Sequence, residues 1–207
     1  MQTRQGPREA VRGCARGRHV VLTPRLLCRS ATLADARVAA ATASDPEAQR
    51  WLGWEPEVRI PEDERDRLLA TPPDRGRTRF GLPRRCDPTS LLAIDPERDL
   101  VAGAVTLTPL SHEVCELGGH LAPAYRGRGL GAELFTAGLA LAHRHLHFTE
   151  VRAGAEPENV ASVRSLWRAG FDPVPGPPTH RLPDGRVIPS AWFADTEPNP
   201  QWCPSLW

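Results

Sequence analysis

Hydrophobic and polar positions in the middle of the chain follow the two-residue period of β-strands. Residues 89–94, 100–107 and 114–121 are rich in apolar and β-branched side chains, and a turn at 95–99 separates the first two. Nearer the N-terminus, the apolar run at 20–28 predicts a first strand, broken at its proline. Because the connections in the middle are short, we expect an antiparallel meander there.

The rest of the pattern is mainly helical. An Ala-rich stretch at 31–43 and a charged stretch at 61–70 each predict a helix. After the meander come a loop and an amphipathic helix, followed by a strand at 148–153, a helix at 158–169 and a last strand near Trp192. The apolar positions of the amphipathic helix are Leu130, Leu134, Ala137 and Leu141. The order there is strand, loop, helix, strand, helix.

Length and composition predict one folded domain with two appendages. A chain of 207 residues, 40% of them hydrophobic, can bury a core of ordinary size, which we place at 19–196. Residues 1–18 carry arginines and hardly any bulky apolar side chain, so we expect a disordered basic arm there and a tail at 197–207. The chain has no transmembrane-length apolar run or secretory signal, and its five cysteines are widely spaced. We therefore expect a reduced, cytoplasmic protein with no membrane contact.

The charge balance excludes several classes of function. Twenty-six basic and 25 acidic residues give a net charge of +1, so no general attraction to nucleic acid is expected, and an anionic ligand must be met by a local site. Every basic residue is an arginine, which excludes a Schiff-base amine and a P-loop lysine. The only tyrosine is Tyr125.

The segment between the strand at 114–121 and the amphipathic helix has the composition of an anion site. Gly127, Gly129 and Gly131 stand at alternate positions, so successive backbone N–H groups can turn toward one point beside a helix N-terminus. Arg126 and Arg128 add positive charge. This combination predicts a cradle for a pyrophosphate.

A dinucleotide-binding fingerprint is one alternative for this loop. Gly127, Gly129 and Ala132 satisfy its spacing, and Glu150 falls about twenty residues further on, where a ribose-binding carboxylate belongs. An antiparallel meander precedes the loop, however, and only one further helix follows Glu150. A dinucleotide-binding oxidoreductase is therefore a distant alternative.

Several motifs resemble the GCN5-related N-acetyltransferases (GNAT), and most closely the RimJ/RimL branch. The family's loop pattern is met by Arg126, Gly129 and Gly131. The branch's opening motif resembles residues 23–29, with Cys28 where leucine is usual, and its central strand resembles 116–123. Further matches are Asp35, the helix motif Asn159, Ser162, Leu166, Gly170 and Phe171, and the hairpin motif Asp184, Gly185 and Arg186.

The resemblance implies an α/β (α+β) fold with a mixed, mostly antiparallel sheet of six or seven strands and about four helices. It implies acetyl-CoA as donor, with no metal, and a sheet splayed at a bulge where the donor lies. The implied donor contacts are Arg126, the backbone of Gly127, Arg128, Gly129, Leu130, Gly131 and Ala132, the strand backbone at His120, Leu121 and Ala122, and Asn159 and Ser162.

Acyl transfer to an amine needs a neutral amine, a donor toward the thioester oxygen and a proton for the leaving thiolate. Glu116 is the candidate base, with an outward-facing strand carboxylate as the competing interpretation. His120 falls four residues later on the same face of an unbroken strand and could relay a proton or pack beside the donor. Leu166 replaces the family's usual helix tyrosine, so Ser165 or Ser162 is the candidate near the sulfur.

The sequence thus predicts an acetyl-CoA-dependent N-acetyltransferase acting on a primary amine, either a protein N-terminus or a small molecule. A non-catalytic acyl-CoA-binding module is the alternative. By resemblance, Trp51, Trp54 and the helix at 61–70 are expected beside the acceptor; the alternative is core packing for the two tryptophans and a solvated face for the charged helix. Three alternating histidines, at 143, 145 and 147, should point to different helix faces, so we expect no metal there. Whether the chain forms a homodimer stays open.

Overall fold

A nine-stranded, mostly antiparallel sheet forms the centre of the protein, with strand order β1-β2-β3-β4-β5-β6-β7-β11-β8. The computed structural model describes residues 10–11, 18–74 and 86–199. The strands of this sheet are β1 Ala10–Val11, β2 Val20–Leu22, β3 Leu27–Thr32, β4 Cys86–Asp95, β5 Leu100–Pro109, β6 Val114–Leu121, β7 Glu150–Ala155, β8 Asp172–Val174 and β11 Ala191–Thr196. A separate hairpin pairs β9 Thr179–Arg181 with β10 Val187–Pro189.

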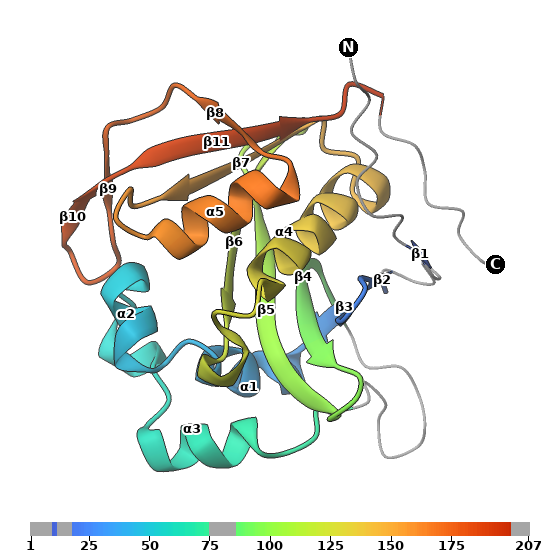
Figure 1. The fold of residues 1–207 in the computed structure, drawn as a ribbon, viewed down its shortest axis with the longest axis vertical. Helices are drawn as coiled ribbons and strands as arrows, with labels where there is room; N and C mark the ends of the chain where they lie inside the picture. The colour runs from blue at the N-terminus through green and yellow to red at the C-terminus, as the bar shows by residue number, and fades with distance from the viewer. Residues whose placement is uncertain (1–9, 12–17, 75–85, 200–207) are drawn as a thin grey trace.

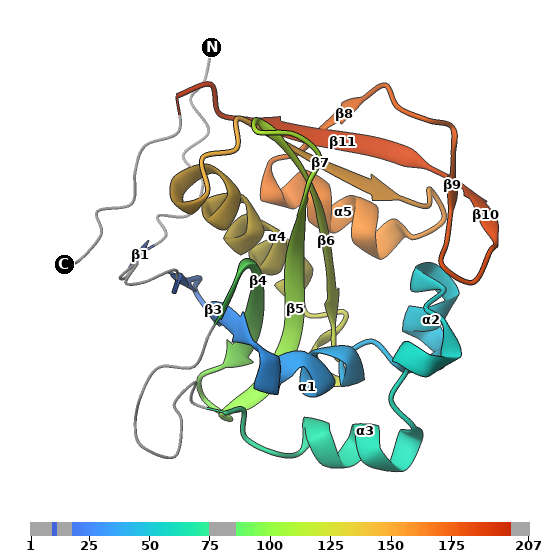
Figure 2. The same cartoon turned by 180° about the vertical axis from the view of Figure 1, so that it is seen from behind.

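Helices cover both faces of the sheet (Figures 1 and 2). The two later helices lie on one face and the three earlier ones lie on the other side of the molecule. The α-helices are α1 Ala36–Ala41, α2 Pro46–Leu52, α3 Glu62–Leu69, α4 Leu130–Ala140 and α5 Val160–Ala169. Short 3₁₀ turns lie at Leu33–Asp35, Pro56–Val58 and Pro123–Tyr125, and α4 continues into a π-helical turn, Leu141–His145.

The predicted fold class and the antiparallel meander are confirmed. Strands β3 to β6 pair in sequence order, each antiparallel to the next. The sheet has more strands than the six or seven expected because the short strands β1 and β8 extend its two edges. A sheet of sequential antiparallel strands is not the doubly wound sheet that a dinucleotide fold requires.

Two local predictions needed correction. The helix expected at 31–43 begins with a 3₁₀ turn and ends at Ala41, and a second helix, α2, follows it. Asp45 caps α2 by accepting a hydrogen bond from the Ala48 N–H at 3.2 Å, with Pro46 in the first turn. Asp followed by Pro is a helix-start signal. The expected arm at 1–18 also contains β1, which pairs with β2; the rest of the arm up to residue 17, and 200–207, lie outside the described residues.

The core lies between the sheet and helices α4 and α5. Leu91, Val105, Leu117, Leu134 and Leu166 are among its fully or nearly fully buried side chains. Packing against this core fixes α4 and α5 relative to strands β5, β6 and β7. These are the elements that carry the predicted site.

The parallel pair β6 and β7 opens partway along its length. Val114, Cys115 and Glu116 pair with residues 150–152 of β7, and the register ends there. Beyond Glu116, one edge of β6 is unpaired with β7, while its other edge stays paired with β5 as far as Leu121. The register between β5 and β6 has no shift, so the opening comes from the divergence of two parallel strands and not from the bulge that was expected.

Candidate active site

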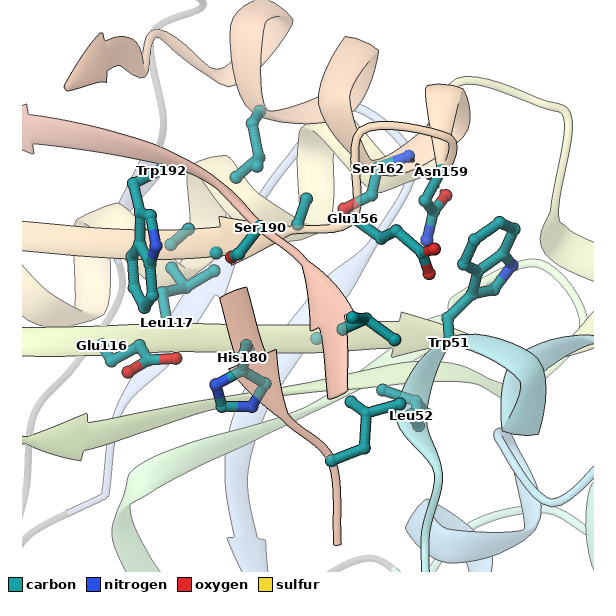
Figure 3. A pocket seen from close by; sticks show the side chains of 18 of the residues that line it. Trp51, Leu52, Glu116, Leu117, Glu156, Asn159, Ser162, His180, Ser190 and Trp192 are labelled. Atoms are coloured by element: carbon teal, nitrogen blue, oxygen red, sulfur yellow. Dashed lines mark hydrogen bonds between the residues drawn. The ribbon is translucent and has the colours of Figure 1, made fainter. Parts of the chain in front are cut away.

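A cavity of about 220 Å³ lies where β6 and β7 diverge (Figure 3). Five elements contribute to it besides these two strands: α2, α4, α5, the hairpin β9–β10 and β11. Its lining is Trp51, Leu52, Glu116, Leu117, Gly118, Gly119, Phe135, Ala153, Gly154, Ala155, Glu156, Asn159, Ser162, Leu166, His180, Leu182, Pro183, Ile188, Ser190 and Trp192.

Strand β6 forms one wall of the cavity. Because its register is unbroken, Glu116, Gly118 and His120 share one face, as predicted, and Leu117 and Gly119 face α4. A Cβ atom built on Gly118 would meet no other atom of the described chain within 4 Å, so the space between Glu116 and His120 is open there. A ligand can therefore approach the backbone of β6 next to the Glu116 carboxylate.

The cavity begins earlier on β6 than the contacts proposed for Leu121 and Ala122. The Leu121 carbonyl accepts a hydrogen bond from Arg126 Nε at 3.0 Å, and the Ala122 N–H donates to the Ala102 carbonyl at 2.8 Å. Ala122 is also buried. The backbone that borders the cavity is instead that of Glu116 to Gly119.

His120 has a different environment from the one expected of a proton relay. Its Nε2 lies 3.2 Å from the Ala39 carbonyl, which can only accept, so Nε2 carries the proton. Its ring also meets Trp54 edge to face at a centroid distance of 5.4 Å. Burial lowers the pKa of His120 to about 4, with Arg126 adding to the effect. A ring that is neutral near pH 7 and bonded to α1 is suited to holding α1 against β6.

The loop before α4 has the backbone shape that its glycines suggested. Gly127 and Gly129 have φ values of 70° and 76°, which side chains rarely adopt. Both are exposed, and among the described residues no atom beyond the adjacent ones lies within 4 Å of a Cβ built on Gly127. Gly129 is the N-cap of α4, so the first N–H groups of this eleven-residue helix begin at Leu130. These donors and the helix dipole can hold an anionic group.

The two arginines of the loop have different positions. Arg126 binds Asp45 through both Nη atoms, one at 2.8 Å, and Glu47 at 3.2 Å, instead of lying free to meet an anion. Burial alone would raise the pKa of Asp45, but its hydrogen bonds with Arg126 keep that pKa below the ordinary value. Arg126 thus joins β6 to the first turn of α2. Arg128 is exposed, 5.7 Å from the centroid of the Tyr125 ring, so it is the arginine available to a phosphate.

The opening motif at residues 23–29 braces the same loop. Thr23 Oγ1 donates to Glu133 on α4 at 2.7 Å, and Arg25 Nε donates to the same carboxylate at 2.6 Å. Arg25 Nη1 also donates to the Arg128 carbonyl at 2.9 Å. A polar motif near the N-terminus therefore fixes the glycine loop and the first turn of α4 together.

Helix α5 brings Asn159, Ser162 and Leu166 to the cavity. Asn159 is the N-cap, as predicted, and its Oδ1 accepts a hydrogen bond from the Ser162 N–H at 3.1 Å. The Asn159 amide nitrogen and the Ser162 hydroxyl remain at the cavity as donors. Leu166 is buried in its wall, so no hydroxyl stands where the family's tyrosine would be.

Ser165, the other serine considered, does not line the cavity. Its hydroxyl donates to the Ala161 carbonyl at 2.8 Å, and a Cβ atom on Gly131 would lie only 2.5 Å from Ser165 Oγ. Gly131 is therefore needed for the close contact of α4 with α5 and not for a special backbone angle. The position of Ser165 favours a packing role.

Gly131→Ala should destabilise the fold by roughly 1–2 kcal/mol, because the added methyl overlaps Ser165 Oγ. The double variant Gly131→Ala, Ser165→Ala should recover most of that loss, since it removes the overlapping oxygen. Urea unfolding of both variants and of Ser165→Ala alone would measure this. Equal destabilisation with and without Ser165 Oγ would show that the contact is not the cause.

Two walls close the cavity on the side away from the core. Trp51 and Leu52 come from α2, and residues of the β9–β10 hairpin face them. Arg186 Nη atoms donate to the carbonyls of Gln49 and Arg50 at the end of α2, at 3.0 and 2.9 Å. The hairpin is thus tied to α2. The helix at 61–70, observed as α3, contributes no residue to this cavity, contrary to expectation.

His143 and His145, at the end of α4, contact different partners. His143 contacts the Phe148 carbonyl at 2.6 Å and Asp195 at 3.0 Å, and His145 Nδ1 lies 2.9 Å from His19 Nδ1. Within the described ranges, no group of three His, Cys, Asp or Glu side chains could hold a metal ion.

In the same ranges, no helix is both long enough and apolar enough to cross a bilayer.

Sequence reasoning missed Glu156, His180 and Trp192 as cavity residues. Trp192 pairs with Gly154 across β7 and β11, and its Nε1 donates to the Pro177 carbonyl at 2.8 Å. The one available signal was the absence of a side chain at Gly154, which leaves room for a ring on the neighbouring strand. The pairing of β11 with β7 could not be derived from their separation along the chain.

A mixed sheet that opens between two parallel strands, with a glycine loop and helix at its end, is the arrangement that the resemblance to the acetyltransferases implied. The family model described as an acetyltransferase (GNAT) domain matches residues 25–172. The chain therefore belongs to the GNAT acetyltransferase family and is an acyltransferase. Members of this family use acetyl-CoA as donor.

Solved structures share this fold at low sequence identity. A GNAT acetyltransferase from Bacillus anthracis has a TM-score of 0.60 at 18% identity, covering 86% of this chain and 98% of its own. Spermidine N-acetyltransferase from Vibrio cholerae, solved with CoA and spermine, has a TM-score of 0.61 at 17% identity, with the same two coverages, 86% and 98%. Ribosomal-protein-S5-alanine acetyltransferase from Vibrio fischeri has a TM-score of 0.60 at 16% identity, covering 89% of this chain and 99% of its own. A search of curated proteins found no significant match.

Proposed function

We propose that this chain transfers an acetyl group from acetyl-CoA directly to a primary amine in the cavity between β6 and β7. The observation that carries the proposal is the end of β6–β7 pairing at Glu116, which places a free strand edge, a carboxylate and the α5 N-terminus around one space. Motifs of the RimJ/RimL type support a protein N-terminus or a small amine as acceptor.

On the donor side, the loop holds the charged part of acetyl-CoA. The N–H groups from Gly127 to Ala132 would bind the pyrophosphate, with Arg128 offsetting its charge. Arg126 would act through Asp45 by fixing α2 and not by touching a phosphate. The pantetheine arm would follow the unpaired edge of β6, since an amide-bearing chain can pair with a strand edge. Among the described residues, a side chain at Gly118 or Gly127 would meet no neighbour, so β6 and the loop both leave room for the donor.

On the acceptor side, Glu116 is the general base. The bound donor supplies a thioester whose carbonyl carbon can be attacked. The amine loses a proton to Glu116 through water, the new N–C bond forms, and the C–S bond breaks. A backbone N–H at the free edge of β6 can stabilise the thioester oxygen. The thiolate takes up a proton from water held near Asn159 and Ser162, because the Leu166 side chain has none to give. The proton taken by Glu116 returns to the solvent and balances the hydroxide that is left.

The non-catalytic CoA-binding module remains the second candidate, favoured by Leu166 at the position of the usual acid. A turnover measurement distinguishes the acetyltransferase from the binding module. Acetyl-CoA mixed with small amines and peptides should yield free thiol and acetylated amine in equal amounts. Thiol release without an acetylated amine, or binding without thiol release, would contradict transfer.

A further inference from the structure

The glycine loop supplies less positive charge to the donor than its sequence suggested. Of its two arginines, Arg126 is committed to Asp45 and Glu47, which leaves the exposed Arg128. The pyrophosphate of CoA carries one negative charge on each phosphate, and the N-terminus of α4 offsets only part of this charge. A further cation beside the loop would have to come from another part of the chain.

Arg25, in the turn between β2 and β3, lies beside the N-cap of α4. Its Nη2 atom is 3.7 Å from a Cβ built on Gly129, the N-cap residue. Its Nη1 donates to the Arg128 carbonyl at 2.9 Å, so the guanidinium lies against the backbone of the glycine loop. Arg25 is therefore next to the first N–H groups of α4, which are the proposed donors to the pyrophosphate.

One nitrogen of the Arg25 guanidinium is available to a ligand. Nε donates to Glu133 at 2.6 Å and Nη1 donates to the loop, whereas no acceptor in the described part of the chain is hydrogen-bonded to Nη2. The side chain is 51% exposed, so a ligand can reach it. Arginine N–H groups form strong, charge-assisted hydrogen bonds with phosphate oxygens. The position and the chemistry of Nη2 thus both suit a phosphate.

Contacts that do not use Nη2 hold Arg25 in this position. Glu133, in the first turn of α4, accepts hydrogen bonds from the Arg25 side chain, from the Arg25 backbone N–H at 3.0 Å and from Thr23 Oγ1 at 2.7 Å. A side chain that is already held loses little conformational freedom when a ligand binds. The ion pair also offsets the charge of Glu133, which would otherwise repel a phosphate at this helix end.

We infer that Arg25 is a donor-binding residue, whose Nη2 donates to the pyrophosphate of CoA beside Arg128. The inference rests on the proposed function, because it adds a residue to the proposed donor site. Arg25 takes the role that position in the loop suggested for Arg126. The opening motif at 23–29 would then bind the donor as well as brace the loop.

Calorimetric titration of the wild type and of Arg25→Gln with CoA tests the inference. Loss of one charge-assisted hydrogen bond should weaken CoA binding about tenfold. Dephospho-CoA, which lacks the ribose phosphate but keeps the pyrophosphate, should show the same loss. Equal affinities of the two proteins for CoA would overturn the inference, and so would a loss that is absent with dephospho-CoA.

Arg37→Gln is the matched control. Arg37 also forms an exposed ion pair with a glutamate of another helix, in this case Glu64 of α3. Its removal should leave the affinity for CoA at the wild-type value. A loss as large as that in Arg25→Gln would mean that the effect is not specific to the loop, and it would overturn the inference.

Salt dependence separates a phosphate contact from support of the loop. An ionic contact with the ligand is screened by salt, so CoA binding should weaken less steeply with KCl in Arg25→Gln than in the wild type. Loss of loop support alone would lower the affinity without changing this dependence. Parallel salt dependences in the two proteins would therefore overturn the inference.

Glu133→Gln makes the same distinction without changing Arg25. The new amide oxygen can still accept from Arg25 Nε, while a negative charge near the phosphate is removed. Its affinity for CoA should equal or exceed that of the wild type. A loss as large as in Arg25→Gln would show that Arg25 acts only by bracing α4, and would overturn the inference. A wild-type protein that binds no CoA would instead contradict the proposed function itself.

Discussion

Glu116→Gln should lower kcat for amine acetylation about a hundredfold, because the amide cannot take the proton of the attacking amine. The substitution keeps the shape of the side chain and removes only its basicity. The acidic limb of the kcat–pH profile should change as well, and raising the pH should recover part of the rate, since more of the amine is then already neutral. Initial rates across pH at saturating acetyl-CoA would measure both effects.

Glu113→Gln is the matched control for this variant. Glu113 is exposed in the turn before β6 and lies outside the cavity, so its amide should leave kcat and the pH profile unchanged. The affinity for CoA should also be the same in both variants and the wild type. A Glu116→Gln profile that overlays the wild-type profile would remove Glu116 from the role of base.

Gly129→Asp should weaken CoA binding by about a hundredfold. The new carboxylate would stand at the N-cap of α4, where the N–H groups of the loop are proposed to meet a pyrophosphate. Like charges in such contact cost several kcal/mol. Calorimetric titration with CoA would give the ratio of dissociation constants.

Gly129→Asn separates charge from backbone strain. Asparagine has nearly the shape of aspartate and also has to adopt the φ of 76° found at Gly129. It should therefore reproduce the strain, while its CoA affinity stays at least tenfold better than that of Gly129→Asp. Equal affinities in the two variants would mean that no anionic group lies beside this residue.

The sequence was a good guide to elements whose signals are local. The β-period at 89–121 predicted β4, β5 and β6, and the spacing from Leu130 to Leu141 predicted α4. Asn159 and Gly170 marked both ends of α5, because an N-cap side chain and a left-handed C-cap are properties of single positions. The face shared by Glu116 and His120 followed from strand geometry alone.

Features that depend on contacts between distant parts of the sequence could not be predicted in the same way. Arg126 looked like a phosphate ligand because charge and loop position suggest one, but its partner Asp45 lies far away in the sequence. Trp192 and His180 reach the cavity only because β11 pairs with β7 and the hairpin docks on α2. No periodicity encodes such contacts. The structure therefore corrected the roles expected for single residues more than it corrected the expected helices and strands.

The transfer itself is tested most directly by following both products of one reaction. Acetyl-CoA and a series of small amines and peptides would be incubated with the protein, with free thiol and acetylated amine quantified together. The account predicts equal amounts of the two, increasing with enzyme concentration and greatly reduced in Glu116→Gln. Tight CoA binding with no acetylated product from any amine would contradict it and identify a binding module instead.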